Sequence, residues 1–194
     1  ASPSVPSVTP WAPRDRAGMF FDLDYYGNAS RGAIPAWKNE MAEMSWLYYL
    51  TFDGLRASKD VRRLSLAGSL RRWKEVVRDV DLLASSEDAG RVMEHFSAYE
   101  GVQEILGRGE TKASVRLKSG LQVDLRVVTD DQFPFALAYF TGSKEHNVAL
   151  RQIAQNLGLK LSEYGIFRGT ELLSCKDEQA IYAALGLPYV PPEL

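Results

Sequence analysis

Two aspartates interrupt an apolar run at Asp79-Val80-Asp81, within the segment LAGSLRRWKEVVRDVDLLA (66–84). The run DVDLLAS (79–85) otherwise predicts a buried strand, in which residues i and i+2 point to the same face of a sheet. The two carboxylates therefore project side by side, and Val80 points to the opposite face. Adjacent carboxylates repel each other, which raises the pKa of one of them, and a divalent cation relieves that repulsion. The chain must therefore fold so that one face of this strand accepts two acids.

The residues before this pair predict a phosphate-binding turn. Gly68-Ser69 follows the strand-like run VRRLSLAG (61–68) and opens a short helical segment, where free backbone N–H groups can receive phosphate. Arg71 or Arg72 can add charge-assisted hydrogen bonds to the same phosphates. One short segment thus combines a phosphate cradle, a guanidinium and an acidic pair.

A third acid extends the predicted site. Asp124 lies in the second strand of a predicted hairpin over 111–128. Three carboxylates on adjacent strands could hold two metal ions suited to in-line phosphoryl chemistry, and Mg²⁺ prefers such oxygen ligands. A second Asp-x-Asp pair, Asp22 and Asp24, has no phosphate-binding companions, so we read it as loop or surface.

The hydrophobic pattern predicts an α+β fold, a sheet layer with helices packed on it. Residues 17–38 show no pattern that assigns an element. The expected elements are a helix at 39–57, strands at 61–68 and 79–85, a helix at 88–99, the hairpin at 111–128 with Ser119-Gly120 as its turn, a helix at about 145–157, short strands around Gly165 and Gly169, and a closing helix at 177–186 with Asp177 near its N-cap.

Composition excludes several classes of protein. The net charge of −2 over 194 residues gives no global basic field, although residues 56–78 are locally basic. Cys175 is the single cysteine, so neither an intrachain disulfide nor a cysteine-based zinc site is expected. No apolar run approaches a membrane span, and the Pro/Ser-rich start (1–16) lacks the pattern of a signal peptide. We expect a cytoplasmic protein without a membrane partner.

Four separated motifs carry a family resemblance. The segments AGSLRRWKEVVRDVDLL, LGRGETKASVRLKSGLQVDLRVV, YFTGSKEHNVALRQIAQNLGLKLSEYGIF and LGLPYVPPEL resemble, in this order, the family X DNA polymerases of bacterial and archaeal type, within the nucleotidyltransferase superfamily. The resemblance covers about residues 46–194. It implies a nucleotidyltransferase palm at 46–133, a mixed β-sheet with helices packed on it, and a small α/β thumb subdomain at 134–194. Residues 1–45 remain an unassigned, partly flexible extension.

The resemblance implies a role for each residue that matches a family motif. These are Asp79, Asp81 and Asp124 as the metal-binding catalytic triad; Gly68, Ser69 and Arg72 at the nucleotide triphosphate; Tyr139, Phe140, Thr141 and Gly142 as the turn beneath its sugar; Asn147 and Arg151 at the nascent base pair and template strand; and Lys112 near the nucleic-acid backbone.

The implied activity is template-directed DNA synthesis of the gap-filling repair type. A monomer would bind primer-template or gapped DNA and a dNTP, with two Mg²⁺ ions or with Mn²⁺ in their place. Two alternatives stay open: a nucleotidyltransferase that modifies RNA or a small molecule, and a DNA-binding module with weak or no catalysis.

Three departures from the family pattern bear on activity. Arg78 stands where many members carry Gly before the first aspartate, and Gln122 stands where many carry Arg near the third. Residues 1–45 do not resemble the family's helical N-terminal domain, and likewise no segment of these 194 residues resembles the C-terminal phosphoesterase domain of many bacterial members. In this scope the chain is similar to the reduced viral members of the family.

Overall fold

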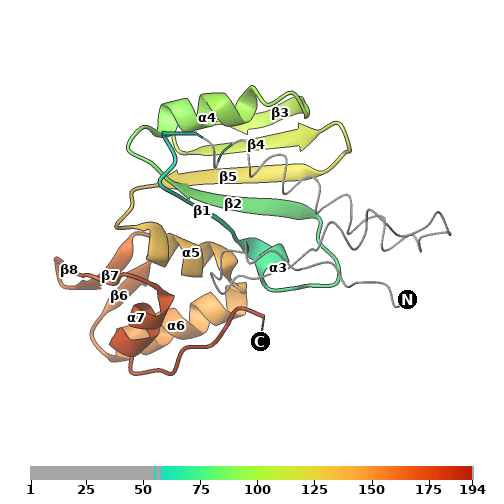
Figure 1. The fold of residues 1–194 in the computed structure, drawn as a ribbon. Helices are drawn as coiled ribbons and strands as arrows, with labels where there is room; N and C mark the ends of the chain where they lie inside the picture. Colours follow the sequence, from blue (N-terminus) through green and yellow to red (C-terminus); the bar gives the residue numbers. More distant parts are fainter. Residues whose placement is uncertain (1–54, 56–57, 194) are drawn as a thin grey trace, which may run out of the picture. The chain divides into compact units, whose positions relative to one another are not determined.

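The computed structural model describes residue 55 and residues 58–193 (Figure 1). The extension at 1–45 and the pair Asp22 and Asp24 lie outside the described residues. The predicted helix at 39–57 lies there as well, except for Leu55, which is helical and buried.

A five-stranded mixed sheet has the strand order β1-β2-β5-β4-β3. β2 and β5 run parallel, whereas the other neighbouring pairs are antiparallel. The predicted strands and the hairpin are confirmed, and the turn at Gly120 has a positive φ of 90° that glycine readily adopts. The strands are β1 (Arg63–Leu66), β2 (Asp79–Ser85), β3 (Val102–Arg108), β4 (Lys112–Leu117) and β5 (Gln122–Val128).

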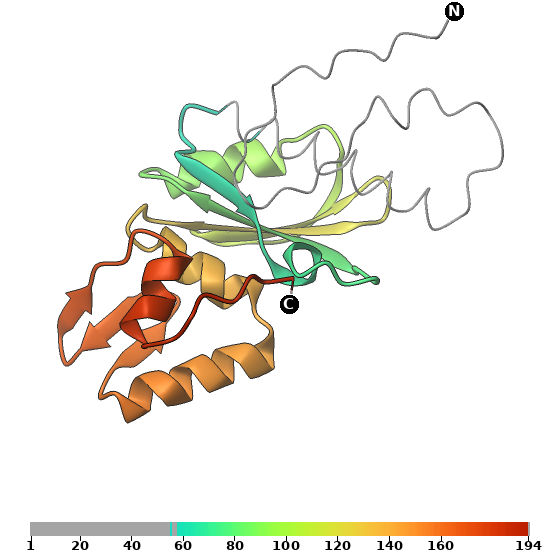
Figure 2. The same ribbon diagram turned by 60° about the horizontal axis from the view of Figure 1, so that its bottom comes forward.

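The two faces of this sheet are covered differently. One face packs against α4 (Ala89–Ser97), whose Val92, Met93 and Phe96 join the alternate apolar residues of β2, β4 and β5 in one core. The side chain of Asp88 caps α4 by accepting a hydrogen bond from the Arg91 N–H at 3.0 Å. The opposite face is covered by α5 (Phe133–Thr141) on the far side of the sheet from α4 (Figure 2), through a small core with Leu83 of β2.

A second core holds the C-terminal elements together. A three-stranded antiparallel sheet, in the order β6-β7-β8, and three helices bury Phe135, Leu150, Ile166 and Ile181. The predicted helices at 145–157 and 177–186 are confirmed, and Asp177 Oδ1 accepts a hydrogen bond from the Ala180 N–H at 2.8 Å. The elements are α6 (Lys144–Asn156), β6 (Lys160–Ser162), β7 (Gly165–Arg168), β8 (Glu171–Leu173) and α7 (Glu178–Ala184).

The sequence patterns do not predict β3 or α5. β3 is an edge strand with two register irregularities, and its residues after Val102 are exposed, so no inward alternation marks it. α5 is apolar nearly all round because it is buried between the two cores, so no helical period marks it. The predicted turn at Tyr139–Gly142 is corrected in part, because Tyr139, Phe140 and Thr141 are the last residues of α5 and Gly142 is its C-cap.

Within the part of the chain that the structure describes, no helix has the length and apolar character needed to cross a bilayer.

A short helix, α3 (Gly68–Arg71), links β1 to β2 and lies beside the aspartate end of β2. The sequence prediction that Gly68-Ser69 opens a short helix after a strand is therefore confirmed. Because α5 covers Leu83 further along the same face of β2, the aspartates lie between α3 and α5.

Candidate active site

The backbone brings the three predicted acids to one face of the five-stranded sheet. In the parallel pairing of β2 with β5, Asp81 lies directly opposite Asp124, and Asp79 lies opposite Gln122. Neighbouring strands of a sheet are about 4.8 Å apart. The intervening Val80 and Val123 are buried in the core on the opposite face. Alternation along two adjacent strands thus places three carboxylates together.

The side chains of the three acids turn toward different partners. Asp124 accepts a hydrogen bond from the Ser114 hydroxyl at Oδ1 and one from Gln122 Nε2 at Oδ2, the latter at 3.1 Å. The Asp81 carboxyl lies so close to Gly68 that a Cβ on that glycine would overlap Oδ2. Among the described residues, therefore, no three acidic, histidine or cysteine side chains are gathered closely enough to hold a metal ion as placed.

The electrostatics of the site favour a cation. The pKa of Asp81 is raised to about 6, chiefly by burial and also by the charges of Asp79 and Asp124, against the opposing charges of Lys112 and Arg72. Like charges with partial burial are the arrangement that a divalent cation relieves. An all-oxygen donor set on one sheet face is also the kind that Mg²⁺ prefers. The chemistry of these oxygen donors therefore fits a divalent cation.

A cavity of about 410 Å³ opens beside these acids. Its volume falls in the usual range of small-molecule sites. One side comes from the five-stranded sheet and α3, and the other comes from the end of α5 and the start of α6. The lining residues are Gly68, Ser69, Arg72, Asp79 and Asp81 on the first side, and Tyr139, Phe140, Gly142, Ser143, Lys144, Asn147 and Arg151 on the second.

One hydrogen bond joins the two sides of the cavity, and another holds the second side together. Arg72 Nη1 donates across the cavity to the carbonyl oxygen of Thr141, and within the second side Asn147 Nδ2 donates to the carbonyl oxygen of Tyr139 at 2.7 Å. The buried Nε of Arg72 has no hydrogen-bond partner among the described residues. Arg151 Nε donates to the Asn147 carbonyl at 3.3 Å, one helical turn earlier. Arg72 thus both lines the cavity and joins its two sides.

Some predicted site residues lie elsewhere. Thr141 is buried and does not line the cavity, because its hydroxyl accepts a hydrogen bond from Arg71 Nη1 at 2.6 Å. Arg71 is paired with Glu178, so of the two arginines it is Arg72 that faces the cavity. Lys112 and Asp124 are also outside the lining, although both charges act on Asp81.

Sequence reasoning missed several residues at the site. Ser143 and Lys144 line the cavity, and Ser114 holds Asp124. Ser143 could have been found as an N-cap, since its hydroxyl accepts a hydrogen bond from the His146 N–H at the start of α6. The contact of Ser114 with Asp124 follows from strand register, in which the two residues are direct partners, and no local pattern reveals it.

Comparison with known proteins gives a consistent set of relatives. The family described as DNA polymerase beta thumb matches residues 136–194. The chain is 40% identical over 136 residues to the DNA polymerase/3'-5' exonuclease PolX of Bacillus subtilis, a match covering 68% of this chain and 24% of that protein. It is 26% identical over 141 residues to the repair DNA polymerase X of African swine fever virus, covering 68% of this chain and 80% of the viral protein.

A third relative is the human DNA-directed DNA/RNA polymerase mu. The chain is 40% identical to it over 76 residues, which cover 38% of this chain and 15% of that protein. The chain therefore spans about a quarter of the length of the bacterial relative.

Proposed function

This chain belongs to the family X DNA polymerases, and from that premise we propose that it fills gaps in DNA by template-directed addition of deoxynucleotides to a primer. The primer 3′-hydroxyl oxygen would form a bond to the α-phosphorus of a dNTP. The bond from that phosphorus to the leaving pyrophosphate would break. The partners would be gapped or primed DNA and a dNTP, bound by a monomer.

The observation that carries this proposal is the composition of the cavity. Acids on the sheet, a serine and an arginine on α3, and amide and guanidinium groups on α6 face one space of about 410 Å³. A nucleoside triphosphate needs these three kinds of group: acids that accept a metal, cationic and hydroxyl groups for phosphate, and hydrogen-bonding groups near the base.

Asp79, Asp81 and Asp124 would hold the metal ions, with two Mg²⁺ ions as the proposed complement and Mn²⁺ as the alternative. Bound there, the metal would neutralise phosphate charge and ease deprotonation of the primer hydroxyl. Asp124 would lie nearest the attacking hydroxyl. Ser114 and Gln122 donate hydrogen bonds to its two oxygens.

The remaining lining residues would bind and orient the nucleotide. Gly68, Ser69 and Arg72 would contact the triphosphate, and their shared position on one side of the cavity supports that role. Tyr139, Phe140 and Gly142 would lie beneath the sugar, with Thr141 supporting this turn through its contact with Arg71. Asn147 and Arg151 would face the base pair and template, and Lys112 would contact the DNA backbone.

The test is single-nucleotide incorporation on a gapped DNA substrate, with each dNTP supplied singly in Mg²⁺ or Mn²⁺. We expect the wild-type chain to add the templated nucleotide. Asp124→Ala should reduce the rate by about 10²–10³-fold or more, since removal of one group that stabilises developing charge has effects of this size. Near-wild-type incorporation by Asp124→Ala would refute the assignment.

A matched control separates catalysis from folding. Glu94→Gln changes an exposed acid on α4, on the other face of the sheet, and should leave the rate unchanged. Extension of an RNA primer, or addition without a template, would favour the alternative nucleotidyltransferase. Retained DNA binding without incorporation in either metal would favour a binding module.

A further inference from the structure

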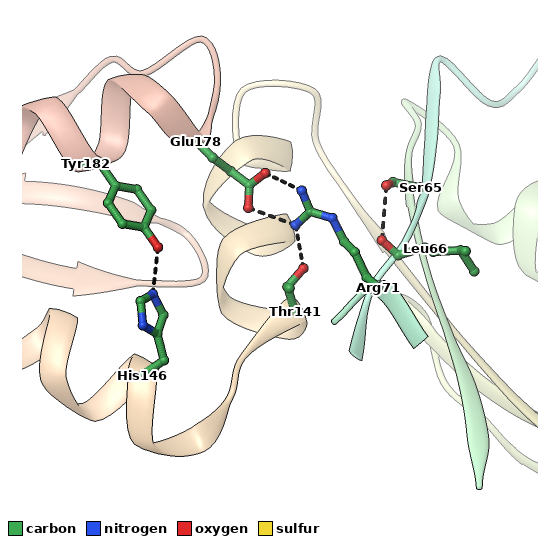
Figure 3. Close-up of polar contacts among 7 residues, drawn as sticks. All are labelled: Ser65, Leu66, Arg71, Thr141, His146, Glu178 and Tyr182. Atoms are coloured by element: carbon green, nitrogen blue, oxygen red, sulfur yellow. Dashed lines mark hydrogen bonds and ion pairs between the residues drawn. The ribbon is translucent and has the colours of Figure 1, made fainter. Parts of the chain in front are cut away.

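Helix α7 supplies no residue to the cavity, yet one face of it contacts both sides of the cavity. Glu178 and Tyr182 are four residues apart, so they lie one turn apart on the same helix face. Glu178 contacts Arg71 of α3, and Tyr182 contacts His146 of α6 (Figure 3). α3 and α6 each contribute lining residues to opposite sides of the cavity.

The contact with α3 is a buried two-point ion pair. Arg71 Nη1 and Nη2 donate to Glu178 Oε1 and Oε2 at 2.8 and 2.5 Å, and Nη1 also donates to Thr141 Oγ1. The two side chains are 10% and 14% exposed. Burial alone would lower the pKa of Arg71, but the hydrogen bond and charge of Glu178 outweigh it and raise the pKa. Two parallel bonds from a planar guanidinium fix orientation as well as distance.

The contact with α6 is a neutral hydrogen bond between stacked rings. His146 Nε2 and Tyr182 Oη are 2.7 Å apart, and the ring centroids lie 6.0 Å apart at 27°. Burial raises the pKa of Tyr182 to about 12, helped by the charge of Glu178, and burial lowers the pKa of His146. Both groups are therefore neutral at pH 7, so the bond does not depend on a charge.

Each of these contacts lies one residue away from a lining residue. Arg71 precedes Arg72, which bonds the Thr141 carbonyl, while Arg71 bonds the Thr141 hydroxyl. His146 precedes Asn147, whose amide bonds the Tyr139 carbonyl. A shift of α7 would therefore move both sides of the cavity through short, partly buried connections.

We propose that Glu178 and Tyr182 are positioning residues that together set the separation of the two sides of the cavity. The consequence for nucleotide binding rests on the proposed function, whereas the coupling between helices does not. Neither side chain needs to touch the nucleotide. The class of ligand affected is the deoxynucleoside triphosphate that the cavity is proposed to bind.

Hydrogen–deuterium exchange on the 194-residue chain, without added nucleotide, tests the coupling directly. Glu178→Gln, which keeps the side-chain shape but removes the charge, should speed exchange in residues 68–72. Tyr182→Phe, which keeps the ring, should speed it in residues 144–147. Glu171→Gln, an exposed acid on β8, is the control and should change neither segment. If exchange is unchanged in both variants, and circular dichroism shows that both are folded, the inference is overturned. This outcome does not depend on whether the chain binds a nucleotide.

Binding of a fluorescent dATP analogue, measured without DNA, tests the consequence. Either variant should weaken the Kd about tenfold, within the usual range for coupling between sites. The double variant Arg71→Glu with Glu178→Arg should bind more tightly than Glu178→Gln, because it restores the opposite charges. Wild-type chain that binds no nucleotide would refute the proposed function, and the exchange result would still decide the coupling. Wild-type affinity in both single variants would refute the positioning role.

Discussion

Two regions of the molecule differ in how their charges are paired: the acidic face of the five-stranded sheet, and the contact of α3 with α7. Asp79, Asp81 and Asp124 bring three like charges together, and none of them is in an ion pair within the described residues. Arg71 and Glu178 instead neutralise each other in a buried, bidentate pair. Charge is thus compensated where it supports the structure and left uncompensated where a charged ligand is proposed to bind. Perturbed, uncompensated groups in a cleft are a general sign of a functional site.

The largest effect should come from breaking the compensated pair. Glu178→Ala leaves the Arg71 charge buried without a partner, and we expect a loss of about 3–5 kcal/mol in the free energy of unfolding. Urea unfolding of the full chain measures it. The double variant Arg71→Met with Glu178→Leu should recover most of the loss, because two apolar side chains leave no buried charge. If Glu178→Ala lowered the free energy of unfolding by less than about 1 kcal/mol, the Arg71–Glu178 pair would behave like an exposed ion pair, and the prediction would be wrong.

A smaller effect is expected where the acidic face meets the backbone of α3. Gly68 has φ +61°, and a Cβ there would overlap Asp81 Oδ2, so Gly68→Ala combines backbone strain with a clash. We expect a loss of about 1–3 kcal/mol in stability, together with weaker nucleotide binding.

The matched control for this change is Gly186→Ala. Gly186 has a similar φ of +70°, and among the described residues, its chain neighbours apart, no atom lies within 4 Å of the position that a Cβ would take. The strain alone should cost about 1–2 kcal/mol. Equal losses in the two variants, with nucleotide affinity unchanged in both, would show that the contact between Gly68 and Asp81 has no role in the site.

The uncompensated acids should make stability depend on pH. The pKa of Asp81 is raised to about 6 in the folded chain, from an ordinary value of 3.8, so its native environment disfavours the ionised form. Its destabilising effect is absent below pH 3.8, grows as pH rises toward 6 and is complete above that. Asp81→Asn should therefore be more stable than wild type at pH 7, by on the order of 1 kcal/mol once solvent screening is allowed for. The two chains should converge near pH 3.5, and urea unfolding at both pH values checks this. A variant less stable than wild type at pH 7 would show that the ionised carboxyl is stabilised in the fold.

The sequence predicts those features of the fold and of the acidic face that depend on local patterns. Alternation along β2 places Asp79 and Asp81 on one face, and caps at Asp88 and Asp177 mark two helices. Strands β4 and β5 follow from their apolar period of two. These elements were predictable because one buried face repeats regularly along the chain.

The parts that depend on distant partners could not be predicted. The choice of Arg72 over Arg71 for the cavity is made by Glu178, which is 107 residues from Arg71 along the chain. The family resemblance implies a turn at Thr141, whereas this residue ends α5, a helix that has no amphipathic period because it is buried between two cores. No local pattern predicts the edge strand β3, because exposure removes its alternation.

The smallest effect should come from an ion pair that matches the Arg71 pair in distance but differs in burial. Arg62 Nη2 and Glu87 Oε1 are 2.5 Å apart, as are Arg71 Nη2 and Glu178 Oε2, yet the first two side chains are 55% and 79% exposed. Water already solvates both charges at the exposed pair, so Glu87→Gln should cost less than about 0.5 kcal/mol, and added salt should remove that cost. Glu178→Gln, the same chemical change at the same distance, should cost several times more and respond little to salt. If the two substitutions had equal effects in the same urea titrations, burial would not be the property that distinguishes the two ion pairs. The contrast between the Arg71–Glu178 pair and the three aspartates would then have to rest on geometry alone.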